Sequence, residues 1–133
     1  MKIETSNFLS AADEALSDAR GNLSINISRQ AARLAYYAQF HAAQALIFER
    51  TCKIAKTHKG VDTQFHKLAK TEPALPADLP GQLSAAYYFK EVADYDTGIS
   101  PPITPAHARD AIATAERFVE AIRQVLAPTP APP

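Results

Sequence analysis

The feature that most constrains this chain is a helical pattern between Arg33 and Glu49 that carries two different stripes of side chains. On the helical period of about 3.6 residues, one stripe is small and aliphatic and consists of Leu34, Ala38, Ala42, Ala45 and Leu46. The stripe beside it, the polar strip, consists of Arg33, Tyr37, His41 and Gln44. Burying polar groups is unfavourable unless each finds a hydrogen-bond partner. This helix therefore needs either a functional site or a structural network along its polar strip.

Length and composition predict a single domain. The 133 residues, of which 47% are hydrophobic, are enough to close one core. The 14 basic and 14 acidic residues cancel, so the chain lacks the overall positive charge of a nucleic-acid or membrane-surface binder, and any RNA contact needs a local patch. A lone cysteine, Cys52, excludes an internal disulfide and a cysteine-rich zinc site, and fits a reducing compartment. Because no stretch resembles a signal peptide or approaches about 18 apolar residues, we expect a cytoplasmic protein without a membrane segment.

Glycines and prolines divide the chain into five expected helices and no strand. We expect them over residues 6–20, from about 24 to 52, over 57–69, from between 77 and 81 to the loop at 96–98, and from 105 to 126. The residue types predict N-caps at Ser6 or Asn7, Thr57 and Thr104, and a C-terminal stop at Gly21.

The expected fold class is all-α, an up-and-down bundle of four main helices plus one short helix. Short connections favour antiparallel neighbours, so the long second and fourth helices should run antiparallel with their alanine-rich faces in contact. We expect one helical domain over residues 1–127. The proline-rich tail 128–133 has little to bury and is expected to be disordered or polyproline-like.

Three sequence blocks occur in a characteristic order: RLAYYAQFHAAQALIFE from Arg33, KTHKGV from Lys56 and KEVADYD from Lys90. In this order the chain resembles the small HEPN proteins of the UPF0332 group, from about Phe8 to Leu126. The resemblance implies a HEPN-like bundle that is usually dimeric. HEPN domains are often ribonuclease toxins, or RNA- or nucleotide-binding proteins, commonly encoded beside a minimal nucleotidyltransferase. It thus implies a homodimer, an RNA or nucleotide ligand held in a dimer cleft of the second and fourth helices, and a minimal nucleotidyltransferase partner.

The chain departs from the catalytic HEPN signature, which is an Arg, four to six residues, then a His. In the UPF0332 group the pattern usually reads Arg, two residues, Ala-Asp-Tyr, whereas this chain has Lys90 in place of the Arg and Tyr95 in place of the His. Tyr, with an ordinary pKa of about 10, is a poor base, and Lys lacks the bidentate fork of Arg. Lys90 and Tyr95 are the candidate catalytic residues of a metal-independent endoribonuclease. Whether the protein is an enzyme stays open.

Six residues are candidates for binding, and each has a structural alternative: Arg33, Tyr37, His41, His58, Lys59 and Asp94. Tyr37 and His41 lie one helical turn apart and could line a groove, or His41 could be a core histidine with satisfied hydrogen bonds. His58 and Lys59 fall at a helix start, where free backbone N–H groups and a cation bind phosphate. The alternative is an ordinary capped turn.

Carboxylates and aromatic residues add weaker signals. Asp94 and Asp96 flank Tyr95 and could hold a cation, but Asp is also common at helix ends, and we expect no metal. The run Tyr87, Tyr88 and Phe89 could stack on bases, although at least one of the three should lie in the core.

Other site chemistries find little support in the sequence. His66 and His107 lack a companion at metal-ligand spacing and are expected on a solvated face. No nucleophilic triad or phosphate-binding glycine loop is visible, so no cofactor is expected.

Three functions follow. The first is a HEPN component of a toxin-antitoxin or related two-gene system that acts on or binds RNA. The second is a noncatalytic module that binds a nucleotide or the partner protein, and the third is a structural dimerisation domain.

Overall fold

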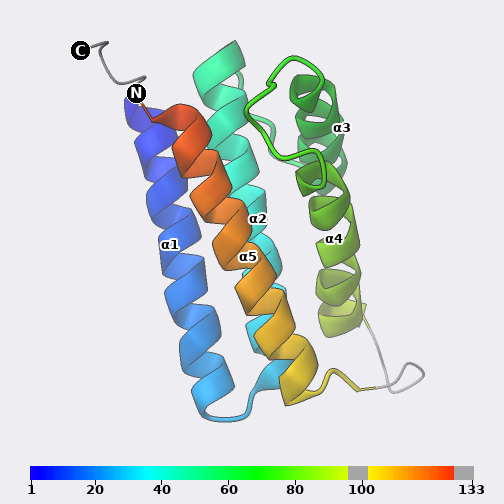
Figure 1. Ribbon diagram of the computed structural model, residues 1–133. Coiled ribbons are helices and arrows are strands. Elements are labelled where there is room, and N and C mark those ends of the chain that lie inside the picture. Colours follow the sequence, from blue (N-terminus) through cyan, green and yellow to red (C-terminus); the bar gives the residue numbers. More distant parts are fainter. Residues whose placement is uncertain (96–101, 128–133) are drawn as a thin grey trace.

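The computed structural model describes residues 1–95 and 102–127, which form five α-helices and no strand (Figure 1). The helices are α1 (Ile3–Ser24), α2 (Ser28–Thr51), α3 (His58–Ala69), α4 (Leu79–Tyr95) and α5 (Pro105–Leu126). The expected all-α bundle with one short helix is confirmed. The expected loop at 96–98 and tail at 128–133 lie outside the described residues.

The long helix α2 is the centre of the bundle and contacts each of the other four helices. α1 and α5 pack on one side of it, and α3 and α4 lie together on the other side (Figure 1). α2 and α4 run antiparallel, as expected (Figure 1). The closest pairing of α2 is with α1, however, and α4 has only a small contact with α5. The α3–α4 pair is therefore held to the bundle largely through α2.

Small side chains explain the close approach of α1 and α2. Their buried faces are rich in alanine, and Ala12, Ala19, Ala31, Ala38 and Ala42 are all fully buried. Interhelical distance depends on the side chains at the contact, so alanine allows two backbones to pack closely. Larger groups fill the other side of the core, where the rings of Phe65 and Phe118 lie 5.4 Å apart. Fully burying such a side chain contributes about 1.5–3 kcal/mol.

The ends of α1 differ from the sequence prediction. α1 begins at Ile3, and neither Ser6 nor Asn7 is its N-cap. The cause is a tertiary contact: the Lys2 backbone N–H and the Thr5 hydroxyl both donate to Glu49 Oε1, each over 2.9 Å. A glutamate on α2 thus fixes where α1 starts.

The turn between α1 and α2 also differs from the predicted stop at Gly21. Gly21 does not end α1, which continues to Ser24, although glycine inside a helix costs about 1 kcal/mol relative to alanine. The left-handed residue of the turn is Asn26, with φ of 64°. Asn adopts this conformation more readily than most residues, so α2 begins at Ser28 and not near Ser24.

The threonine caps are confirmed. Thr57 Oγ1 accepts a hydrogen bond of 2.9 Å from the backbone N–H of Gly60 at the start of α3. Thr104 Oγ1 accepts from the His107 N–H over 3.1 Å, while the Thr104 N–H donates to His107 Nδ1 over 3.2 Å. This reciprocal capping box gives His107 a structural role as well as its place on a solvated face. None of the described helices has the length and apolarity needed to cross a membrane.

Candidate functional site at the junction of α2, α3 and α4

Two of the predicted cations share one carboxylate where α2 meets α4. Asp94 Oδ1 accepts a hydrogen bond of 2.6 Å from Arg33 Nε, and Asp94 Oδ2 lies 2.9 Å from Lys90 Nζ. Burial raises the pKa of Asp94, but the hydrogen bonds from Lys90 and Arg33 outweigh burial and hold this pKa below its usual range. The hydrogen bond with Asp94 raises the pKa of Lys90. The network is therefore fully ionised at neutral pH and keeps one positive charge in excess.

Aromatic rings enclose this ion network. The guanidinium of Arg33 lies 5.0 Å from the centre of the Tyr37 ring. Lys90 Nζ lies 5.3 Å from the Tyr95 ring and 5.7 Å from the Tyr87 ring. Such cation–π contacts are worth about 0.5–2 kcal/mol each, depending on exposure. They leave Lys90 only 6% exposed, so its ammonium is not free to meet a phosphate in this arrangement.

A second group of residues surrounds His58, the first residue of α3. The Tyr36 hydroxyl of α2 lies 2.7 Å from His58 Nδ1. The rings of Tyr87 and Phe40 lie 5.1 and 5.2 Å from the imidazole. Burial, and then the charge of Lys90, lower the pKa of His58, while burial raises the pKa of Tyr36 well above its usual value. At neutral pH the pair is therefore an uncharged imidazole beside an uncharged phenol.

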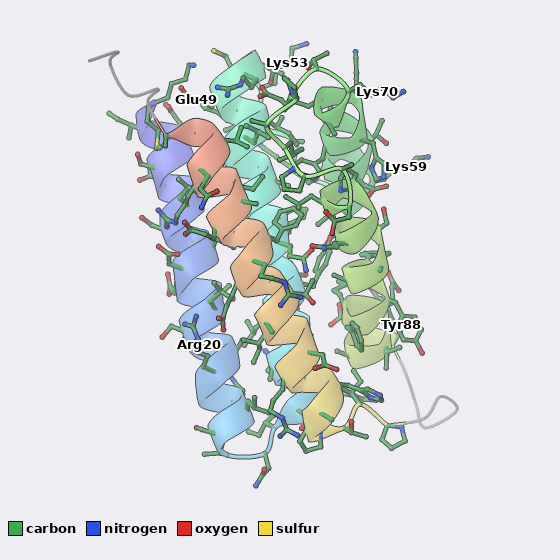
Figure 2. The ribbon with its side chains drawn as sticks, in the orientation of Figure 1. Arg20, Glu49, Lys53, Lys59, Lys70 and Tyr88 are labelled. Atoms are coloured by element: carbon green, nitrogen blue, oxygen red, sulfur yellow. The ribbon has the colours of Figure 1, made fainter. Side chains whose placement is uncertain are left out.

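A cavity of about 290 Å³ opens beside this pair, and we call it the polar pocket. It is lined by Tyr36, His58, Lys59, Asp62, Leu83, Ser84 and Tyr87. Inside it the Ser84 hydroxyl donates to Asp62 Oδ1 over 2.8 Å. Lys59 and Tyr88 extend from the outer side of α3 and α4, away from α1 (Figure 2). The pocket thus combines a neutral imidazole, an exposed ammonium, a helix N-terminus and the acidic side chain of Asp62.

The structure separates the predicted site residues into three places. Lys90, Tyr95, Arg33, Tyr37 and Asp94 form the ion network with its rings, whereas His58 and Lys59 line the polar pocket. Tyr95 is 68% exposed.

The third place is that of His41. His41 Nδ1 lies 2.9 Å from Gln44 Oε1, and Gln44 Nε2 donates to the Ala55 carbonyl over 2.8 Å. Each residue of the polar strip therefore has a polar or cation–π partner. Arg33 and Tyr37 contribute to the ion network, while His41 and Gln44 anchor the chain that leads to α3.

Sequence reasoning missed Tyr36, Asp62 and the involvement of Ser84. Tyr36 is adjacent to Tyr37 but lies on the buried side of α2. Its role depends on the docking of α3, which brings His58 from 22 positions away, and no local spacing reveals that contact. In the described residues no group of three His, Cys, Asp or Glu side chains is arranged to hold a metal ion. Asp96, the second carboxylate beside Tyr95, lies outside the described residues.

Comparison with known proteins agrees with this fold. No curated protein matches the chain. Among solved structures, the crystal structure of TT1696 from Thermus thermophilus is similar, with a TM-score of 0.77 and 20% sequence identity. The similarity covers 93% of this chain and 99% of that chain. At 20% identity it supports the fold alone. A family model for the HEPN domain matches residues 5–125, nearly the whole of the helical bundle. The chain therefore belongs to the HEPN domain family.

Proposed function

We propose that the protein is the HEPN component of a toxin-antitoxin or related two-gene system, of the UPF0332-like kind, and that it binds RNA at the polar pocket. The observation that carries the proposal is the position of His58 and Lys59 in the first turn of α3, beside the ion network of Arg33, Lys90 and Asp94.

The start of α3 has the chemistry of a phosphate site. The first N–H groups of a helix lack intrahelical partners and carry a partial positive charge. Thr57 accepts from the Gly60 N–H, while the exposed ammonium of Lys59 adds a full charge beside the remaining donors. The ion network supplies a further positive charge nearby, which offsets the acidic side chain of Asp62 in the pocket lining.

The hydrogen bond between Tyr36 and His58 favours binding over cleavage. A buried phenol needs an acceptor for its O–H, and His58 Nδ1 lies at hydrogen-bond distance from the Tyr36 hydroxyl. If Tyr36 donates, the proton of the neutral imidazole lies on Nε2, where it can donate to a phosphate oxygen but cannot accept a proton from a ribose hydroxyl. This tautomer makes His58 a binding residue.

Cleavage by the usual HEPN route also lacks its second partner. Lys90 is buried and paired with Asp94, so it does not replace the phosphate-binding Arg of the catalytic signature. Tyr95 is a poor base for the reason given above. A noncatalytic HEPN module that binds a nucleotide or its partner protein is therefore the second candidate function, and the burial of Lys90 is the observation that favours it.

Exposed aromatic residues support contact with single-stranded RNA. Tyr88 and Tyr95 on α4 are 57% and 68% exposed, and exposed rings beside a positive groove can stack on unpaired bases. We further propose a two-fold homodimer that brings the two copies of α4 together, and a minimal nucleotidyltransferase as the protein partner. Light scattering at high micromolar concentration should then give the mass of a dimer.

The test is direct. The protein is expressed alone and with its gene neighbour, and growth and RNA integrity are followed. Purified protein is titrated against fluorescently labelled single-stranded RNA. Saturable binding that weakens with salt supports the proposal. Unchanged growth, intact RNA and no RNA binding at low salt would reject it and leave the noncatalytic module, which binds a nucleotide or a partner protein, or a structural dimerisation domain.

A further inference from the structure

A second cavity, of about 240 Å³, lies between α2, α4 and α5. Tyr36 borders both this cavity and the polar pocket. Most of the side chains that line this second cavity are small, and they include Ala32 and Ala35 from α2 and Ala85 and Ala86 from α4. α4 and α5 make little contact, so alanine on these faces leaves open space instead of a packed seam. We call this cavity the amide pocket because two glutamine side chains line it.

Those glutamines present acceptors without partners. Gln39 is 2% exposed, and its Oε1 is buried without a hydrogen-bond partner in the part of the chain that the structure describes. Gln82 Oε1 is likewise a buried oxygen without a hydrogen-bond partner among the described residues. The amide nitrogen of Gln82 already donates to Asp78 Oδ2 over 2.7 Å, which fixes the carbonyl as the free end. Buried carbonyl oxygens without partners are uncommon and destabilising. Both of the residues that carry these oxygens line this one cavity, so a ligand bound there is a source of the missing donors once the amides rotate toward it.

The charged residues that line the cavity indicate which kind of ligand could supply those donors. α5 contributes Asp110 and His107 to the lining, and among the described residues no Lys or Arg lines the cavity. His107 Nδ1 accepts from the Thr104 N–H in the capping box, so this nitrogen already has a partner within the protein. An anionic ligand would meet Asp110 without a compensating cation. A planar group with several N–H donors and a positive charge would satisfy both carbonyls and the carboxylate.

We propose that the amide pocket binds a guanidinium or amidine group carried on a short apolar or aromatic stem. The stem would lie against the alanines and the ring of Phe89, and the N–H groups would donate to Gln39 and Gln82. Such a group has two sources, a free small molecule or an arginine side chain of a partner protein. This site is separate from the RNA site proposed above, and the two can fail independently.

The experiment uses the full chain labelled with ¹⁵N and benzamidine as the probe. The side-chain amide signals of Gln39 and Gln82 should shift in a saturable way at probe concentrations up to about 10 mM, the range expected for a fragment-sized ligand. Toluene, which has a similar ring without donors, should bind at least about tenfold more weakly, since it leaves both carbonyls unpaired. No saturable shift, or equal binding of toluene, would overturn the proposal.

Two variants and a control keep the test independent of folding. Gln39→Leu should lose about tenfold in benzamidine affinity, yet melt at the same temperature or higher because an unpaired buried carbonyl is removed. Asp110→Asn changes an exposed residue and should weaken benzamidine about threefold. Gln64→Leu, the same chemical change at an exposed position of α3, should change neither affinity nor shifts. Unchanged affinity in both Gln39→Leu and Asp110→Asn would overturn the proposal.

Two further probes separate the sources and the competing ligand class. A capped Gly-Arg-Gly peptide that binds at least as well as benzamidine would assign the group to an arginine of a partner protein. Benzamidine binding without peptide binding would assign it to a free small molecule. Adenosine that binds more tightly than benzamidine would show a nucleobase pocket and overturn the cationic assignment.

Discussion

The hydroxyl of Tyr36 lies 2.7 Å from Nδ1 of His58, so a buried residue in α2 orients the imidazole that begins α3. The contact joins the long central helix to the short one, and it holds the imidazole in one orientation. Burial keeps the phenol protonated and the imidazole neutral, as the directions of their two pKa shifts require. This hydrogen bond therefore both docks α3 on α2 and orients His58 for the proposed RNA binding.

Tyr36→Phe removes only that hydroxyl. We expect it to lower the free energy of unfolding by about 1 kcal/mol, the usual net value of a hydrogen bond, and to weaken RNA binding because His58 loses its orienting partner. Urea denaturation measures the first effect and fluorescence anisotropy the second. Tyr88→Phe, the same change at an exposed tyrosine, is the control and should alter stability little. A Tyr36→Phe protein with full stability and full RNA affinity would contradict the role given to this bond.

Stability should decrease in mild acid because of His58. Its pKa is lower in the folded protein than the ordinary value of 6.5, so the unfolded chain binds a proton more readily. The contribution of His58 is therefore present above about pH 6.5 and is lost as the pH falls through the folded-state pKa. Denaturation curves between pH 7.5 and about 5 should show a steeper loss for the natural protein than for His58→Gln, which does not titrate. Parallel pH profiles for the two proteins would be inconsistent with a neutral, half-buried imidazole.

Asp94 should matter more for stability than Lys90 does. Asp94→Asn leaves Lys90 buried with a weakened partner and should lower the free energy of unfolding by about 2 kcal/mol, less than for a fully buried pair because Asp94 is partly exposed. Lys90→Met keeps most of the volume and leaves Asp94 paired with Arg33, so it should cost less than about 1 kcal/mol. Chemical denaturation of both variants gives the comparison. A larger loss in Lys90→Met than in Asp94→Asn would show that this order is wrong.

Sequence patterns predicted those parts of the fold that depend on local chemistry. The caps at Thr57 and Thr104 need only a side-chain oxygen three residues before a free N–H, and both are present. The start of α1 was predicted wrongly because Glu49, a residue far along the chain, binds Lys2 and Thr5. Long-range contacts of this kind leave no periodic signal.

The candidate site also combines features that local sequence predicts with contacts that only the folded chain reveals. Arg33, Lys90 and Asp94 were separate candidates from the sequence, and spacing alone could not show that Asp94 neutralises one of the two cations or that Lys90 is buried. Tyr36 entered the site only through the packing of α3 against α2. Charge seen in a sequence is therefore available for a ligand only after the internal ion pairs are known.

Lys59 should carry most of the exposed charge that RNA meets at the polar pocket. Lys59→Ala should weaken binding and reduce the slope of log K against log salt by about 0.7–1, as expected for one lost phosphate contact. Lys70 lies at the other end of α3, away from Lys59 (Figure 2). Lys70→Ala is therefore the control and should leave the slope unchanged. Anisotropy titrations at several salt concentrations measure both. Equal slopes for the natural protein and Lys59→Ala would place the RNA elsewhere.

The exposed hydroxyl of Tyr95 gives the last prediction. Tyr95 is 68% exposed, and the resemblance to HEPN toxins implies that a tyrosine at this motif can be modified by a nucleotidyltransferase of the same two-gene system. If the same occurs here, the phenolic oxygen attacks the α-phosphate of a nucleoside triphosphate, a phosphodiester bond forms and pyrophosphate leaves. Co-expression with the gene neighbour should then increase the intact mass by one or more nucleotidyl groups. Tyr95→Phe should abolish the increase while costing less than about 1 kcal/mol of stability, because the hydroxyl belongs to an exposed residue. Tyr88→Phe is the matched control on the same helix and should keep the added mass. A nucleotidyl group that persists in Tyr95→Phe would assign the modification to another residue, whereas an unmodified mass in the natural protein would exclude this form of control by the partner.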